Sequence, residues 1–239
     1  MKKKWQLVFV LFLLLITTGC LYPNDRLAKN QVSNDLQLQT VQQAVESYRE
    51  AKTGLLPIKN RNSDTPIFIK YPVDFNALKQ NGFLASTPGN AFEEGGFYQY
   101  VIINVETNPT VKVIDLRMTE KLRQLNVQLE MYRNKHLYPP FGEMISNGVY
   151  NLNHEKIGLD EPPYVVSPYS QDNLPIVIDT NGELFIDYSK DLYRALKDFP
   201  NDYEQGDDIR YILAEQYPFV PAYSLPYTIK DGEPVFFKE

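Results

Sequence analysis

Side chains able to act as a general base or a metal ligand are few in this sequence. The two histidines, His136 and His154, lie 18 residues apart, too far for a histidine-rich metal motif. The sequence contains no phosphate-binding glycine loop, no Gly-x-Ser-x-Gly elbow and no His-Glu-x-x-His pair. We expect His136 to lie at a helix C-terminus and His154 in a polar loop. The sequence therefore predicts no catalytic residue, no metal site and no cofactor.

Acidic side chains are densest between Asp198 and Asp208. A calcium loop needs oxygen ligands at alternating positions, but counting back from Gly206 places Tyr203 at one of them. Tyrosine does not coordinate calcium. We therefore interpret this segment as a solvated acidic loop that caps the next helix.

Tyrosine and proline are unusually frequent, with 17 residues of each. They concentrate in segments 164–169 and 217–227. We favour the interpretation that these residues fix long loops onto a sheet. The alternative is a binding face, because a tyrosine ring can stack on a sugar or on a proline-rich peptide. The candidate binding-face residues are Tyr164, Tyr169, Tyr217, Tyr223 and Tyr227.

The N-terminus carries a targeting pattern. Three lysines at positions 2–4 precede an uncharged apolar run of ten residues, 7–16. That length suits a signal peptide and falls short of the ~20 residues of a transmembrane helix. With Gly19 and Cys20, the pattern resembles a bacterial lipoprotein signal, although Thr17 replaces the usual leucine. The resemblance implies cleavage between Gly19 and Cys20 and diacylation of Cys20. An ordinary secretory signal or a retained anchor would leave Cys20, the single cysteine, unexplained.

This resemblance also implies the location of the folded body. Two acyl chains hold a protein stably on a membrane. The polar residues 21–34 that follow form a tether, which spans roughly 45–50 Å when fully extended. We therefore expect a lipid-anchored protein on the extracytoplasmic face of the cell membrane.

Charge excludes one class of partner. The 239 residues include 24 Lys and Arg against 30 Asp and Glu, a net charge of −6. Without the three lysines of the predicted signal, the balance is 21 − 30 = −9. Nucleic-acid affinity comes mainly from basic side chains on phosphates, so nucleic acid is not an expected partner. An apolar fraction of 43% predicts a folded core.

The helices and strands expected to position these residues form a repeated pattern along the sequence. Apolar residues at spacings of 3, 4 and 3 predict amphipathic helices over 38–52 and 122–134. The second stripe lies 84 residues after the first, and both helices contain Glu-x-Tyr-Arg before a proline stop. Each helix leads through a long loop to a β-hairpin, and a third hairpin follows a short helix at about 208–216. The predicted hairpins pair 97–106 with 111–116, 175–179 with 183–187, and 226–230 with 233–238.

The predicted fold class is therefore α+β, built from tandem helix-plus-antiparallel-hairpin modules, two complete and one partial. The helix exits resemble those in the globular heads of pseudopilins. Over its mature length the chain is similar to the Bacillus-type YphF-like lipoproteins, which implies localisation but no chemistry. The predicted boundaries are 1–19 for the signal peptide, 20–34 for the lipidated cysteine and tether, 35–117 for module 1, 118–189 for module 2, and 190–239 for partial module 3.

We expect a non-catalytic lipoprotein that binds or scaffolds a protein or a neutral glycan between membrane and cell wall. One alternative is the solute-binding lipoprotein of a transporter, which a deep cleft between two lobes would favour. Another is an enzyme that modifies wall polymer, which an isolated buried carboxylate pair about 5–9.5 Å apart would favour. A shallow aromatic surface would favour the binding protein.

Overall fold

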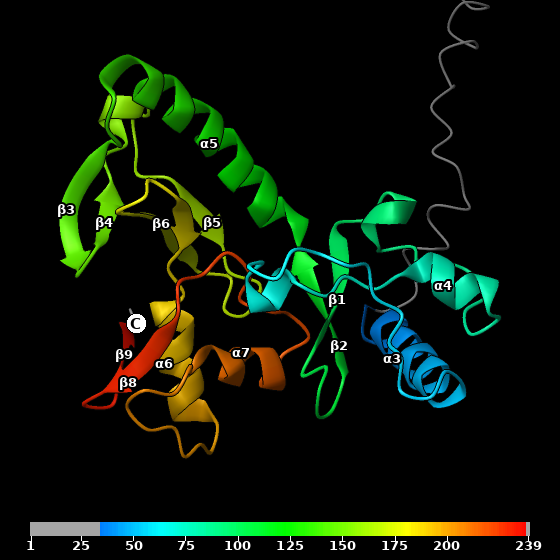
Figure 1. The fold of residues 1–239 in the computed structure, drawn as a ribbon. Helices are drawn as coiled ribbons and strands as arrows, with labels where there is room; N and C mark the ends of the chain where they lie inside the picture. The colour runs from blue at the N-terminus through cyan, green and yellow to red at the C-terminus, as the bar shows by residue number, and fades with distance from the viewer. Residues whose placement is uncertain (1–33, 238–239) are drawn as a thin grey trace, which may run out of the picture.

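The computed structural model describes residues 34–237 (Figure 1). The predicted signal peptide, its cleavage site, Cys20 and nearly all of the tether lie outside these residues. Within 34–237, no helix combines the length and the apolar composition required to cross a bilayer. The chain folds into helices and small antiparallel sheets, which confirms the predicted α+β class.

The first predicted helix and hairpin are both present. Helix α3 (Asn34–Ala51) buries Val41 and Val45 against the hairpin of β1 (Tyr98–Ile103) and β2 (Thr110–Asp115). Gln42 ties the helix to the hairpin, because its side chain accepts a hydrogen bond from the Val111 N–H at 2.6 Å and donates one to the Pro109 carbonyl at 3.1 Å. The apolar stripe thus faces the sheet, as its spacing predicts.

The connection between α3 and β1 contains short helices: η1 (Ile67–Ile69), α4 (Phe75–Gln80) and η2 (Phe92–Glu94). It returns to α3 through Asn90, whose N–H donates to the Gln37 side chain at 3.1 Å and whose amide oxygen accepts from the Tyr100 hydroxyl at 2.7 Å. Gly96 allows this close approach, since a Cβ there would lie 2.0 Å from the Asn90 carbonyl oxygen.

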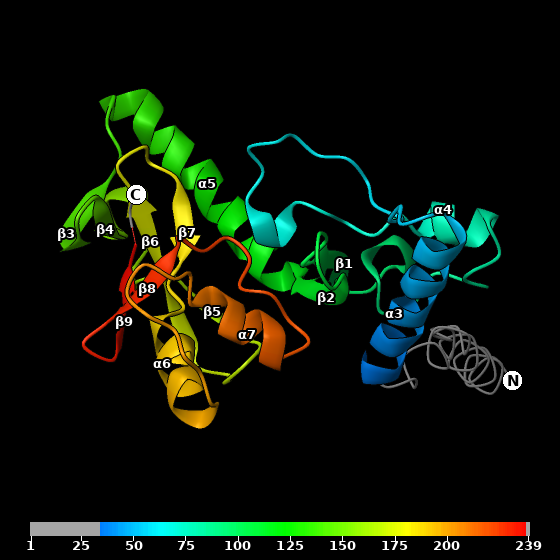
Figure 2. The same cartoon turned by 60° about the horizontal axis from the view of Figure 1, so that its bottom comes forward.

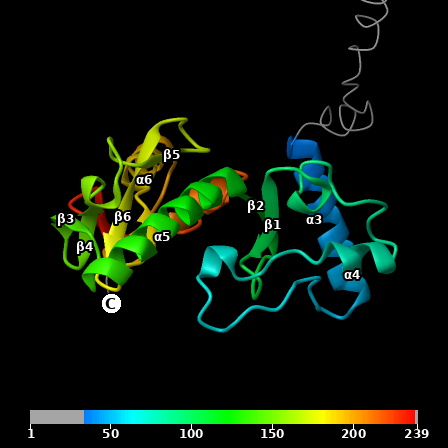
Figure 3. The same cartoon turned by 90° about the horizontal axis from the view of Figure 1, so that it is seen from above.

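The long helix α5 (Leu116–His136) starts directly after β2 and contains the second predicted helix. Asp115 caps it by accepting a hydrogen bond from the Arg117 N–H at 3.0 Å. Its buried residues begin with Met118, one turn before the predicted stripe. Figure 3 shows α5 running between the β1–β2 hairpin and the second sheet.

The second sheet is larger than expected. The predicted hairpin is confirmed as β6 (Asn173–Asp179) and β7 (Leu184–Ile186). However, the segment expected to be a long loop forms three further strands: β3 (Phe141–Ser146), β4 (Val149–Leu152) and β5 (Tyr164–Val166). The order is β3-β4-β6-β5, with β7 also paired to β6. Module 2 therefore carries five strands where a single hairpin was predicted.

The C-terminal part contains α6 (Ser189–Asp198), α7 (Arg210–Gln216) and the predicted hairpin of β8 (Tyr227–Lys230) and β9 (Glu233–Phe236). Helix α6 is absent from the sequence-based prediction. Its signal was Leu192, Ala195 and Leu196 at helical spacing, two of which are fully buried. In Figure 2, α6 and α7 lie below the second sheet, with α7 toward β1 and β2.

The buried side chains form three clusters. One lies between α3 and the β1–β2 hairpin, and a second joins α5, the second sheet, α6, α7 and β8. The third packs residues from 214–222 against the β1–β2 hairpin and Phe68. Residues 190–239 thus contribute to the cores on both sides. The third cluster contains Phe68, Val101, Ile103, Ile114, Ala214, Val220 and Ala222.

The segment after α7 is hydrogen-bonded to β2. The Val113 N–H donates to the Pro218 carbonyl at 2.9 Å, and the Val220 N–H donates to the Val113 carbonyl at 3.1 Å. The Lys112 ammonium donates to the carbonyls of Glu215 and Tyr217, at 3.2 and 2.8 Å, and so caps the end of α7. Burial lowers the pKa of Lys112. These contacts join the two sheets through the C-terminal segment.

Candidate functional site: the β5 groove

A groove of about 800 Å³ lies between the start of α5 and the segment around β5. We call it the β5 groove. One wall is a single face of α5, and the other is the unbroken run 159–168 together with Gln171. The α5 wall consists of Asp115, Arg117, Met118 and Lys121.

Strand β5 is an edge strand whose outer side faces this groove. It pairs with β6 in the register Val165↔Leu174, and the Ser167 N–H donates to the Asp172 carbonyl at 2.8 Å. Backbone groups alternate in direction along a strand. Since Ser167 points its N–H at the β6 side, Val165 does the same, and Tyr164 and Val166 point their N–H and C=O groups away. In the described part of the chain, no strand pairs with that outer side.

A buried carboxylate fixes the turn that ends β5. Asp191 of α6 is 2% exposed and accepts hydrogen bonds from the hydroxyls of Ser167 at 2.7 Å and Ser170 at 2.6 Å. The Ser167 hydroxyl in turn accepts from the Tyr169 N–H at 3.0 Å. Burial raises the pKa of Asp191, while the two hydroxyls lower it. These bonds hold the exit of β5 in one position.

The two walls of the groove carry opposite charges. On α5, the Arg117 guanidinium binds Asp115, with Nε donating to Oδ1 at 2.9 Å, and this hydrogen bond raises the pKa of Arg117. Lys121 lies one turn further along. Asp160 and Glu161 lie on the other wall. Within residues 34–237, no hydrogen bond or ion pair engages the side chains of Lys121, Asp160 or Glu161, so these charges are available to a ligand.

Of the predicted binding-face tyrosines, only Tyr164 lines this groove, and it is 46% exposed. Tyr169 and Tyr217 are half-buried and contact each other edge to face, with ring centroids 5.2 Å apart. Tyr223 is half-buried, with a positive φ of 57°. Tyr227 is 0% exposed. The structure therefore separates the predicted face into one exposed groove residue, three half-buried rings and one core residue.

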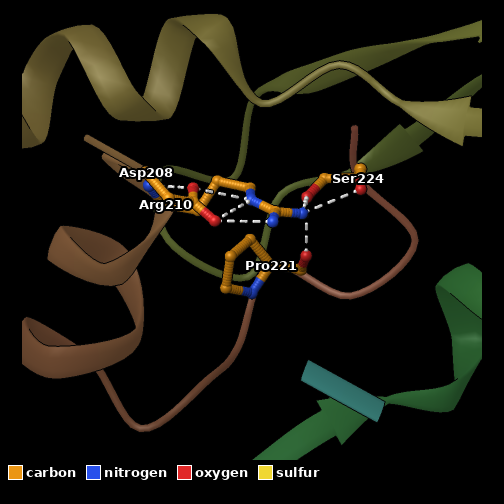
Figure 4. A network of polar contacts seen from close by, with 4 residues as sticks. All are labelled: Asp208, Arg210, Pro221 and Ser224. Carbon is orange, nitrogen blue, oxygen red and sulfur yellow. Dashed lines mark hydrogen bonds and ion pairs between the residues drawn. The ribbon is translucent and has the colours of Figure 1, made fainter. Parts of the chain in front are cut away.

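Arg210 is hydrogen-bonded to the second Tyr/Pro-rich segment, and Figure 4 shows its guanidinium between Asp208 and Ser224. Its guanidinium forms two-pronged contacts with Asp208, at 2.8 and 2.6 Å, and donates to the Ser224 carbonyl at 3.0 Å. The Ser224 hydroxyl donates to the Pro221 carbonyl at 2.9 Å. The guanidinium also lies 5.1 Å from the ring centre of Phe68. Asp208, expected in a solvated loop, thus takes part in a nearly buried ion pair.

The α5 wall was not predicted from the sequence. Its available signals were Asp115 directly before the helix and the basic residues Arg117 and Lys121 at a four-residue spacing. Of the two histidines, His136 ends α5 as expected, and His154 lies in the loop after β4. In residues 34–237, no cluster of three or more His, Cys, Asp or Glu side chains is arranged to hold a metal ion.

No curated protein and no solved structure matches the chain. The family match covers helix α3, the connecting segment with its short helices, and the β1–β2 hairpin. It ends at Asp115, and every other residue that lines the β5 groove, on both walls, lies beyond it. Residues 34–115, from the first residue of α3 to the last residue of β2, match the YphF family N-terminal domain.

Proposed function

We propose that this protein is a membrane-anchored extracytoplasmic lipoprotein that captures a partner in the β5 groove and does not act on it chemically. The observation that carries the proposal is the combination of a groove with an unpaired strand edge. Tyr164 and Val166 expose their side chains along it, at 46% and 48%. Edge strands attract other chains, and β5, although it is short and flanked by prolines, has no strand over its outer edge within residues 34–237. An uncovered, partly apolar edge beside a groove is suited to binding.

The walls of the groove suit binding because they are fixed before a partner arrives. Asp191 fixes the end of β5, and Asp115 fixes the first turn of α5. A preformed site loses less conformational entropy on binding. The charged side chains at the borders of the groove can orient a partner that is held by apolar contacts. The proposed role at the membrane/cell-wall interface follows from the targeting pattern, and either a protein or a neutral glycan meets the stated requirements.

Photo-crosslinking in living bacteria tests the groove. A photoreactive phenylalanine at Val166 is expected to give defined adducts with a partner after irradiation. The same residue at Val127, an exposed position on α5 that is 54% accessible and outside the groove, is the matched control and is expected to give none. Digestion of the adducts by a protease or by a muramidase distinguishes protein from glycan. Identical patterns from both positions, or no adduct from Val166, would contradict capture in the groove.

Replacement of Cys20 by Ala is expected to abolish lipidation. The protein should then remain an uncleaved precursor or leave the membrane fraction, because no acyl chain can be attached. Mass spectrometry of the N-terminus and membrane fractionation measure both effects. Thr17→Leu, which restores the usual lipoprotein residue, is the control and should be processed normally. A wild-type mature chain that begins elsewhere and carries no diacylglycerol would disprove the anchor.

A further inference from the structure

We infer that the segment bound in the β5 groove is an extended peptide of a partner protein, which adds a strand to the outer edge of β5. This inference rests on the proposed function, since it specifies what the groove captures. It commits to a peptide backbone as the ligand, in place of a glycan or a small solute.

The first argument is the direction of the backbone groups. Tyr164 and Val166 both point N–H and C=O groups away from β6, as the Ser167–Asp172 hydrogen bond and the register require. Together they offer two donors and two acceptors, separated by two residues or about 6.6 Å. An extended peptide presents complementary groups at the same repeat, which is the basis of binding by strand addition.

The second argument is the path of the groove. If the groove lay on one face of the sheet, only alternate residues of β5 would line it. Instead every residue from Pro162 to Pro168 lines it, which places the groove along the strand edge. In a sheet, a strand occupies about 4.8 Å by 10 Å in cross-section and 3.3 Å in length per residue, or about 160 Å³. The volume of about 800 Å³ therefore accommodates about five residues.

The third argument is how the edge is bounded. Pro163 precedes Tyr164, and Pro168 follows Ser167, so prolines flank the open edge on both sides. Prolines cannot donate hydrogen bonds and therefore limit pairing to a short strand. Such an edge resists indefinite association with other chains but still admits one short peptide.

The charges of the walls specify the peptide further. Lys121 has no ion-pair partner within residues 34–237, and it lies on the wall opposite β5. Val165 of β5 and Met118 of α5 belong to the same buried cluster, so α5 lies over the face of the sheet toward which Val165 points. A peptide strand added beside β5 presents alternate side chains to that face. The expected ligand is therefore a segment of about five extended residues, with an apolar side chain against Met118 and an acidic side chain facing Lys121.

The test uses the full chain, purified in detergent, and a displayed library of random heptapeptides as the probe. Val166→Pro removes one outward N–H without breaking a bond to β6, while Val166→Thr keeps the N–H and changes the side chain. Peptides selected by the wild type should bind Val166→Pro about 10- to 30-fold more weakly and Val166→Thr within about threefold. Hydrogen exchange should show protection of the Tyr164 and Val166 amides only in the complex.

Two results would overturn strand addition. One is the selection of no peptide, and the other is peptide binding that leaves those amides unprotected and is equal in the two variants. Thermal unfolding of both variants verifies that each is folded. If the photo-crosslinked adducts at Val166 were digested only by a muramidase, the partner would be a glycan. The strand-addition proposal would then fail, while the proposed binding function would stand. The absence of any adduct would reject both.

Discussion

Replacement of Arg210 by Ala is expected to lower the free energy of unfolding by about 3–5 kcal/mol. The guanidinium is nearly buried, at 9% exposure, while Asp208 is 28% exposed. The substitution leaves the Asp208 carboxylate without its cation and the Ser224 carbonyl without its donor. It also removes the contact with Phe68, which belongs to the cluster that packs residues 214–222 against the β1–β2 hairpin. Urea-induced unfolding measures the loss.

The matched control for this substitution is Arg123→Ala. Arg123 also forms a two-pronged pair, with Glu120, but both side chains are exposed, at 68% and 48%. Solvent-exposed pairs of this kind contribute little to stability, so Arg123→Ala should leave the urea unfolding curve almost unchanged. Arg210→Lys should lie between the two, because an ammonium retains the charge but not the planar fork. Equal effects of Arg210→Ala and Arg123→Ala would show that the buried network does not stabilise the fold.

Elements with a strong local pattern were predicted correctly from the sequence. The stripe of α3 and that of α5 were visible because one face of each helix is buried along most of its length. The turns at Asn181-Gly182 and Asp231-Gly232 marked two hairpins, since these glycines adopt the positive φ angles that tight turns require. In these segments local preference and tertiary packing agree.

The missed strands have weak local patterns for physical reasons. No residue of β3 is buried, so no buried face imposes an alternation of apolar and polar residues. Strand β5 has only three residues, and its pairing depends on β6. A pattern of such length cannot be distinguished from a loop. Prolines around it also reduced the strand signal.

Only one wall of the β5 groove could be identified from the sequence. Tyr164 was identified as a candidate because its segment is rich in tyrosine and proline. The opposite wall was not, because nothing local indicates that the start of α5 lies beside β5 in the fold. The same limit applied to Tyr227, whose burial depends on contacts with Asp187 and Tyr188 of a distant segment. Composition therefore located the region of interest but could not separate groove residues from core residues.

Two tyrosine-to-phenylalanine substitutions are expected to have different effects on the free energy of unfolding. Tyr227→Phe should lower the free energy of unfolding by about 1.5–3 kcal/mol. The Tyr227 hydroxyl donates to Asp187 Oδ1 at 2.8 Å and accepts from the buried Tyr188 N–H at 3.2 Å, so its loss leaves that N–H unsatisfied. Burial raises the pKa of Tyr227 well above its ordinary value.

Tyr169→Phe is the matched comparison, because the Tyr169 hydroxyl is also buried but has no hydrogen-bond partner within residues 34–237. The folded state buries this hydroxyl without a hydrogen bond to replace those it makes with water in the unfolded chain. Its removal should therefore leave the free energy of unfolding unchanged or raise it by about 1 kcal/mol. The ring contacts with Tyr188 and Tyr217 stay in place. Urea unfolding of both variants measures the contrast. An equal loss in both would mean that the Tyr169 hydroxyl is hydrogen-bonded in solution and would contradict the expected contrast.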